Sequence, residues 1–265
     1  MIYKTIVYQK SRQVACITLN RPEAANTINL QMAMEIEEAC QRINGDEDTT
    51  VVVLTGAGGE AFCSGEDFNQ ISDTVSDDAL SPDALKEFTL RYNVSAMVGG
   101  IRCPVVAAIN GEALGAGLAL ALSCDVRVAS SQALFGVPDL ARGYFLANGI
   151  TQLLPRIVGR GKAMELILTT ETVDASEALR IGLIHRIAPH HEVFSEAEKL
   201  AGDIASKAPL SLRYIKEAVN KGLDLTLEQG LGLECDLYMI LHTTHDRTEG
   251  VKAFREKRQP SFVGE

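Results

Sequence analysis

Two short apolar runs place the strongest limits on how this chain can fold. Residues 50–55 read Thr-Val-Val-Val-Leu-Thr, and residues 104–109 read Pro-Val-Val-Ala-Ala-Ile. Neither run alternates with polar residues, which is typical of a strand buried on both faces. Each run stops at a turn of small residues, Gly56-Ala57-Gly58-Gly59 in the first case and Asn110-Gly111 in the second. Both segments are therefore predicted to be buried strands that end in tight turns.

The rest of the first half alternates strand and helix patterns, and the second half is almost entirely helical in pattern. The predicted elements are a hairpin of strands at 4–9 and 14–19, a helix at 29–44 capped by Asn29, a helix at about 113–123, and short strands at 126–129 and 133–135. Residues 72–82 are rich in Ser and Asp and predict a mobile surface loop. Beyond Gly149 the helical pattern is interrupted only at glycines and prolines. This order predicts an α/β fold of stacked β-β-α units followed by helices that form a cap or an assembly surface.

Composition narrows the class of protein. A chain of 265 residues suits one large α/β domain, or one domain with a helical appendage. The formal net charge of −10 argues against nucleic-acid binding, which requires a basic surface. Six cysteines without C-x-x-C spacing favour a reducing compartment. Together with an N-terminus unlike a signal peptide and no apolar run of about 20 residues, they predict a cytoplasmic protein without a membrane span.

The segment that follows the second buried strand is a candidate ligand site. Gly115-Ala116-Gly117 opens a helix with almost no side-chain bulk, so a ligand could reach the unpaired backbone N–H groups there. For this segment taken alone, close packing of the helix against a sheet is a slightly better explanation of the small residues. The segment lacks the third glycine of a dinucleotide fingerprint, and the chain contains no P-loop Gly-Lys-Ser/Thr.

A second stretch of small residues, Phe62-Cys63-Ser64-Gly65-Glu66-Asp67-Phe68, follows the first buried strand and its glycine turn. Two such loops from adjacent strands could converge, and their backbone N–H groups would then form an oxyanion hole for a carbonyl oxygen. Cys63 is better explained as a packed small residue than as a reactive thiol. His242 and His245 lie three residues apart but have no third ligand at a useful spacing, so no metal site is predicted.

Over nearly its whole length the chain resembles the crotonase superfamily, the enoyl-CoA hydratase/isomerase enzymes. The matching segments are Leu19-Asn20-Arg21-Pro22 with Asn26, Phe62 to Asp67, Pro104 to Gly111, Ala113 to Gly117, Ser123-Cys124-Asp125, Phe135-Gly136-Val137-Pro138-Asp139, Gly182-Leu183-Ile184, Glu249-Gly250, Ala253-Phe254 and Glu256-Lys257-Arg258.

The resemblance implies a spiral of β-β-α repeats over residues 1–200 and a C-terminal helical region, for trimerisation or as a cap, over residues 201–265. It also implies a homotrimer or homohexamer and a coenzyme A thioester as the substrate, with no metal or redox cofactor. By position, the N–H groups of Glu66 and Ala116 would hold the thioester oxygen of an enolate. Coenzyme A contacts would come from Arg21, Pro22, Ala24, Ser64, Gly65, Glu66, Asp67, Phe68, Gly115 and Lys257, with Arg258 as the alternative to Lys257.

Two positions depart from the pattern of the family's hydratases, which place a glutamate at each. Ala119 has no titratable group and cannot hold or deprotonate a water molecule. Asp139 can act as an acid or base, although its carboxyl group is one methylene closer to the backbone. A helix cap ahead of Leu140 is the alternative role for Asp139.

A single carboxylate at Asp139 favours double-bond isomerisation, with hydration close behind. A hydrolase or decarboxylase of the same superfamily, or an acyl-CoA-binding scaffold without activity, are the alternatives. The side chain of Glu66 is expected to face solvent; otherwise it adds a second carboxylate beside the thioester. Arg142, Tyr144 and Asn148 are candidates to line the acyl pocket.

Overall fold

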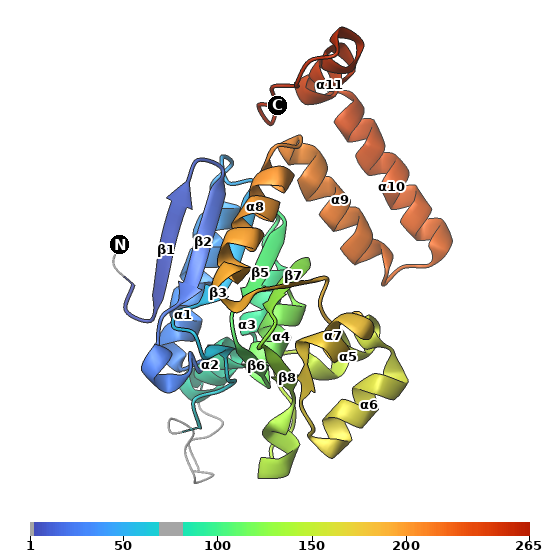
Figure 1. Ribbon diagram of the computed structural model, residues 1–265. Coiled ribbons are helices and arrows are strands. Elements are labelled where there is room, and N and C mark those ends of the chain that lie inside the picture. The colour runs from blue at the N-terminus through green and yellow to red at the C-terminus, as the bar shows by residue number, and fades with distance from the viewer. Residues whose placement is uncertain (1–2, 69–81) are drawn as a thin grey trace.

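The computed structural model of the protein describes residues 3–68 and 82–265, and its β-strands form two sheets (Figure 1). Most of the loop predicted at 72–82 lies outside the described residues. The larger sheet has the order β1-β2-β3-β5-β7-β10, with strands Ile6–Ser11, Val14–Leu19, Val51–Gly56, Val105–Ile109, Val126–Ser130 and Arg186–Ala188. The smaller sheet has the order β4-β6-β8-β9, with strands Ala61–Cys63, Glu112–Leu114, Leu134–Gly136 and Val173–Asp174.

Successive strand pairs divide between the two sheets, and this produces the predicted β-β-α spiral. β3, β5 and β7 lie side by side in the larger sheet, and the strand that follows each of them, β4, β6 or β8, lies in the smaller one. The pairs β3–β5, β5–β7, β4–β6 and β6–β8 are all parallel. Because each repeat returns the chain in the same direction, the turns after β4 and β6 leave the smaller sheet at the same edge.

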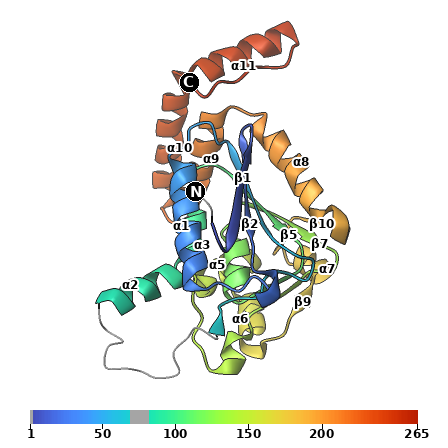
Figure 2. The same ribbon diagram turned by 90° about the vertical axis from the view of Figure 1, so that its left-hand side faces the viewer.

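The two faces of the larger sheet are buried in separate apolar cores. Along β3, Val52 and Leu54 face the main core with α1 (Leu30–Asn44), while Val51 and Val53 face α8 (Val193–Ala205). Figure 2 shows α1 and α8 on opposite sides of this sheet. Burial on both faces is the reason the apolar runs show no alternation.

The remaining helices cover the smaller sheet or extend from the body. They are α2 (Pro82–Arg91), α3 (Val94–Gly99), α4 (Ala116–Leu122), α5 (Ile150–Val158), α6 (Arg160–Thr169), α7 (Ala175–Arg180), α9 (Pro209–Gly222), α10 (Leu227–His242) and α11 (His245–Glu256), with short 3-10 turns η1 (Pro22–Ala24), η4 (Pro138–Arg142) and η5 (His190–Glu192). Asn29 caps α1 as predicted, its side chain accepting a hydrogen bond from Met32 N. In the described residues no helix is long and apolar enough to cross a membrane.

Two details of the predicted elements are wrong. The helix expected from about 113 begins only at Ala116, because residues 112–114 form β6 and pair with β4 and β8. The second half is not purely helical, because β9 and β10 each add a short edge strand to a sheet. Both strands have only two or three residues, too few to show a periodic pattern.

The start of α4 lies so close to β4 that only glycine fits at position 117. A methyl group built on Gly117 would lie 1.9 Å from the carbonyl oxygen of Cys63, a backbone atom that cannot move aside cheaply. Replacing Gly117 by alanine is therefore expected to lower the free energy of unfolding by about 1–3 kcal/mol, as in other overpacked cores. Urea denaturation measures this change.

The matched control for Gly117→Ala is Gly202→Ala in α8, where a built methyl group meets no atom within 4 Å. There alanine is expected to stabilise the protein by up to about 1 kcal/mol through its higher helix propensity. Equal effects of the two substitutions would contradict the close approach of α4 to β4.

Candidate active site

The two turns selected from the sequence lie next to each other in the fold. Parallel pairing of β4 with β6 aligns Cys63 with Ala113, so the turn at 64–68 and the turn at 115–117 start from the same edge. Gly65 has a positive φ of 104°, and a methyl group built on it would lie 3.2 Å from Leu114 O and 3.8 Å from Ala116 N. The prediction that these two loops converge is confirmed by this geometry.

Among the described residues, two backbone N–H groups at this junction have no hydrogen-bond acceptor. A parallel bridge joins Ile28 to the 64–68 turn through the carbonyl of Gly65 and the N–H of Asp67, which leaves out the N–H of Glu66. Ala116 is the first residue of α4, where an N–H has no partner within its helix. Within residues 3–68 and 82–265, neither N–H donates a hydrogen bond to another residue.

Asp139 lies directly beside the second turn. Its 3-10 turn, η4, brings the carboxyl group so close to Gly115 that a methyl group there would lie 2.6 Å from Asp139 Oδ2. Gly115 also has a positive φ of 49°, so both its conformation and its neighbour favour glycine. The alternative role of Asp139 as a helix cap is wrong, because Val137 occupies the cap position of η4 and no side chain caps the turn.

Burial changes the acidity of Asp139. Desolvation raises the pKa of this carboxyl group, and its own backbone N–H and the charge of Arg142 offset the rise only in part. Among the described residues Oδ2 is buried without a hydrogen-bond partner. A buried carboxyl oxygen without a partner lowers stability, so its presence points to a role in function.

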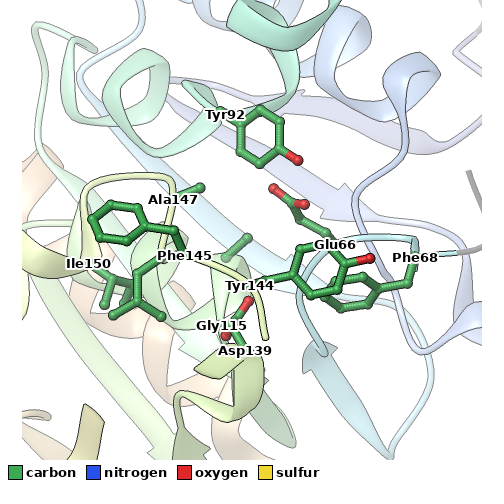
Figure 3. Close-up of a pocket in the computed structure, with 11 residues that line it drawn as sticks. Glu66, Phe68, Tyr92, Gly115, Asp139, Tyr144, Phe145, Ala147 and Ile150 are labelled. Atoms are coloured by element: carbon green, nitrogen blue, oxygen red, sulfur yellow. The ribbon is translucent and has the colours of Figure 1, made fainter. Parts of the chain in front are cut away.

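The expectation that the Glu66 side chain faces solvent is wrong. The residue is only 7% exposed, and its carboxyl group points into the same recess as Asp139 (Figure 3). Burial raises the pKa of Glu66 to about 7; the charge of Arg91 and a hydrogen bond with the Tyr92 hydroxyl lower it, and the charge of Asp139 raises it further. Glu66 is therefore a second titratable group in the site.

The recess between these groups spans about 340 Å³, counting space that is open to solvent. Its wall is formed by two carboxyl groups, the Gly115-Ala116 backbone and a mostly apolar set of side chains: Phe68, Tyr92, Tyr144, Phe145, Leu146, Ala147 and Ile150. Ala119 is not part of the wall, because its methyl group is completely buried within α4. Chemically, such a recess can stabilise negative charge on a carbonyl oxygen and move protons beside it.

A larger apolar depression, about 1310 Å³ when the space open to solvent is counted, adjoins the recess. Tyr144, Phe145 and Leu146 line both, and the far wall of the depression includes Met164 and Leu168 of α6. Of the residues predicted to line an acyl pocket, Tyr144 lines this depression. Asn148 does not, because its amide is buried and bonds to Val94 N and Arg91 O, where it holds the start of α3.

Several predicted coenzyme A contacts are linked to one another or to neighbouring residues by side-chain interactions. Arg21 precedes Pro22 and Ala24 of η1 and pairs with Asp67 at 2.8 Å, which ties η1 to the 64–68 turn. Phe68 packs against Tyr144 with ring centroids 4.9 Å apart, and the Arg142 guanidinium lies over the Phe68 ring. The side chain of Ser64 is directed to Glu112 at 3.4 Å.

Lys257 lies apart from these residues. It follows α11, at the opposite end of the molecule from the recess (Figure 1). The alternative, Arg258, is engaged by Glu249 and Glu256 in ion pairs of 2.5–2.8 Å.

The described residues contain no cluster of three or more His, Cys, Asp or Glu side chains that could hold a metal ion.

The fold and the recess together define a class of enzymes built on a β-β-α spiral, and comparison with known proteins specifies the family. The model of the enoyl-CoA hydratase/isomerase family matches residues 9–265. The chain is 36% identical to the crotonyl-CoA hydratase of Syntrophomonas wolfei, with 99% of both chains covered. It is 37% identical to the (E)-benzylidenesuccinyl-CoA hydratase of Thauera aromatica, with 98% and 99% covered.

The crystal structure of an enoyl-CoA hydratase from Bacillus anthracis superposes with a TM-score of 0.93 at 36% identity, covering 99% of this chain and 100% of that one. The chain belongs to the enoyl-CoA hydratase/isomerase family and is an enzyme of that family. The resemblance inferred from the sequence is confirmed, as is the crotonase-like fold.

Sequence reasoning missed Tyr92 and the inward direction of Glu66. Tyr92 follows α2 with no recognisable motif around it, so only the folded chain brings it to the recess.

Proposed function

We propose that this enzyme acts on an enoyl thioester of coenzyme A through an enolate. The thioester oxygen accepts hydrogen bonds from the N–H groups of Glu66 and Ala116, and Asp139 transfers the proton at the carbon next to the carbonyl. The position of the Asp139 carboxyl group against Gly115, next to these unused N–H groups, is the observation that carries the proposal.

The reaction that suits this site best is movement of the double bond. An isomerisation removes a proton from one carbon and returns one to another, so no water molecule has to be held and activated. The absence of a carboxylate at Ala119 removes one of the two groups that would hold such a water, and leaves proton transfer intact.

Hydration is the second candidate, and two observations favour it. The relatives described above are named hydratases. The carboxyl group of Glu66 also supplies the recess with a second acid or base, although from a different position than Ala119.

Incubation with 2-enoyl and 3-enoyl thioesters of coenzyme A in D₂O distinguishes these reactions. Mass spectrometry and chromatography are expected to show deuterium uptake with a shifted double bond. A product heavier by one water would instead establish hydration. Free coenzyme A would indicate a hydrolase, loss of carbon dioxide from a carboxylated analogue would indicate a decarboxylase, and binding without turnover would indicate a scaffold.

The coenzyme A moiety is proposed to lie along η1 and the 64–68 turn, with the acyl tail in the apolar depression beside the recess. Long-chain and aromatic thioesters included in the same panel test this arrangement, since they would gain affinity from burial of apolar surface.

We propose that Lys257 contacts the nucleotide bound to a second copy of the chain, because it lies at the opposite end of the molecule from the recess. The C-terminal helices expose apolar side chains that favour such assembly: Ile215, Val219, Leu223, Leu227, Leu231 and Phe254. A homotrimer or homohexamer is proposed, and sedimentation equilibrium gives its mass.

A further inference from the structure

The two carboxyl groups of the recess come from different elements, Glu66 from the turn after β4 and Asp139 from η4. Figure 3 shows the Asp139 carboxyl beside Gly115 and the Glu66 carboxyl directed toward the Tyr92 hydroxyl. Each has one buried oxygen without a hydrogen-bond partner among the described residues, Oδ2 of Asp139 and Oε1 of Glu66. The proposed function uses Asp139 and only the backbone of Glu66, so the buried carboxyl group of Glu66 still requires an explanation.

The surroundings of Glu66 hold its side chain in place. It lies in the turn after β4, with the Tyr92 hydroxyl bonded to its carboxyl group and the guanidinium of Arg91 nearby. Arg91 and Tyr92 come from the end of α2 and the residues just beyond it, and Asp139 comes from η4. A carboxyl group that only caps a turn or faces solvent does not require a buried hydrogen-bond partner and a nearby cation.

We propose that Glu66 is a second proton-transfer residue, which acts at the end of the substrate's allylic unit that Asp139 does not serve, and that Tyr92 positions its carboxyl group. This assignment rests on the proposed enolate chemistry.

With a 3-enoyl thioester as the substrate, two proton transfers move the double bond. The Asp139 carboxylate takes the proton from C2, and the C–H electron pair forms a dienolate whose oxygen is held by the N–H groups of Glu66 and Ala116. The Glu66 carboxyl group gives its proton to C4, and the double bond moves between C2 and C3. Asp139 is then protonated and Glu66 ionised, and exchange of one proton with solvent restores both groups. No oxidant or other reactant is required.

The charges around the two residues suit this division. At neutral pH a substantial share of Glu66 is protonated, because burial raises its pKa to about 7. For Asp139, whose ordinary pKa is lower, burial raises the pKa and the nearby charge of Arg142 works against this rise by favouring the ionised form. Pairs of titratable groups whose environments hold them in different protonation states are the usual arrangement of an acid and a base.

The test is a 3-enoyl thioester labelled with deuterium at C2 and converted in H₂O. If Asp139 takes the proton from C2 and Glu66 protonates C4, the deuterium label passes to solvent and C4 receives hydrogen from solvent. If Asp139 alone carries the proton, a measurable share of the label appears at C4, which would overturn the assignment.

In the Glu66→Gln variant we expect isomerisation to fall by about 10²-fold or more, while C2 hydrogen exchange through Asp139 persists. Persistent exchange also shows that the variant is folded. Isomerisation near the wild-type rate would overturn the role of Glu66 alone. Absence of both exchange and bond movement in the wild type would overturn the enolate chemistry, and this assignment with it.

Tyr92→Phe tests the positioning role through the pH profile. The hydrogen bond with Tyr92 lowers the pKa of Glu66, so its loss is expected to move the alkaline fall of activity to higher pH. An unchanged profile would contradict the positioning role of Tyr92.

Discussion

Replacing Asp139 by asparagine is expected to lower kcat by about 10²- to 10⁴-fold, the usual contribution of a positioned acid or base. Asparagine keeps the shape of the side chain beside Gly115 but cannot take up a proton. Binding of coenzyme A thioesters is expected to change little, because the proposed nucleotide contacts lie on η1 and the 64–68 turn. Steady-state kinetics and calorimetric titration with a product thioester measure the two effects separately.

The same substitution is expected to raise stability at neutral pH. The pKa of Asp139 is higher in the folded protein than in the unfolded chain, so folding disfavours its ionised form. The contribution of this group to stability is therefore full at low pH and is lost as pH rises through the folded-state pKa. Asparagine does not ionise, so the variant does not lose stability in this way as pH rises. The Tm of the variant should therefore exceed that of the wild type at neutral pH, and the difference should shrink in acid.

Asp174→Asn provides the control for Asp139→Asn. Asp174 is exposed and caps α7 by accepting a hydrogen bond from Glu177 N, a task that asparagine performs equally well. Turnover and stability of this variant should stay near the wild-type values. Wild-type turnover in Asp139→Asn would show that another group moves the proton.

The parts of the fold that the sequence predicted are those governed by local chemistry or by burial on both faces. Asn29 is a strong N-cap and is followed by apolar residues at helical spacing, so α1 was found with its start. β3 and β5 were found because both of their faces are buried. β6 and β10 have three residues each and exist only because neighbouring strands pair with them, so no local pattern marks them.

The residues of the site likewise fall into those that local sequence predicts and those whose positions depend on distant parts of the chain. Ala116 and Asp139 could be selected because they lie in segments that resemble the family, and the structure places both at one recess. The direction of the Glu66 side chain could not be predicted, because it depends on Arg91 and Tyr92, which are distant in sequence. The nearness of Asn148 to Asp139 in sequence favours a place in the acyl pocket, yet its side-chain amide is buried and hydrogen-bonded to Val94 N and Arg91 O.

Replacing Ala116 by proline is expected to lower kcat by about 10²- to 10³-fold, equivalent to about 2.7–4 kcal/mol of transition-state stabilisation. Proline lacks the N–H that is proposed to hold the enolate oxygen. Ala116 is the first residue of α4, so proline there removes no hydrogen bond within the helix. The first bond of α4, from Ala119 N to Gly115 O, remains possible.

A control substitution to proline at another helix start distinguishes the loss of the Ala116 N–H donor from a general effect of proline on folding. His245 is the exposed first residue of α11, and Thr244 before it is extended with ψ of 151°, which suits a following proline. His245→Pro should keep near-normal kcat, while Ala116→Pro should lose activity with a Tm close to that of the wild type. A folded Ala116→Pro enzyme with a near-normal rate would mean that the thioester oxygen is held elsewhere, and the turn at 115–117 would then serve only to pack α4 against β4.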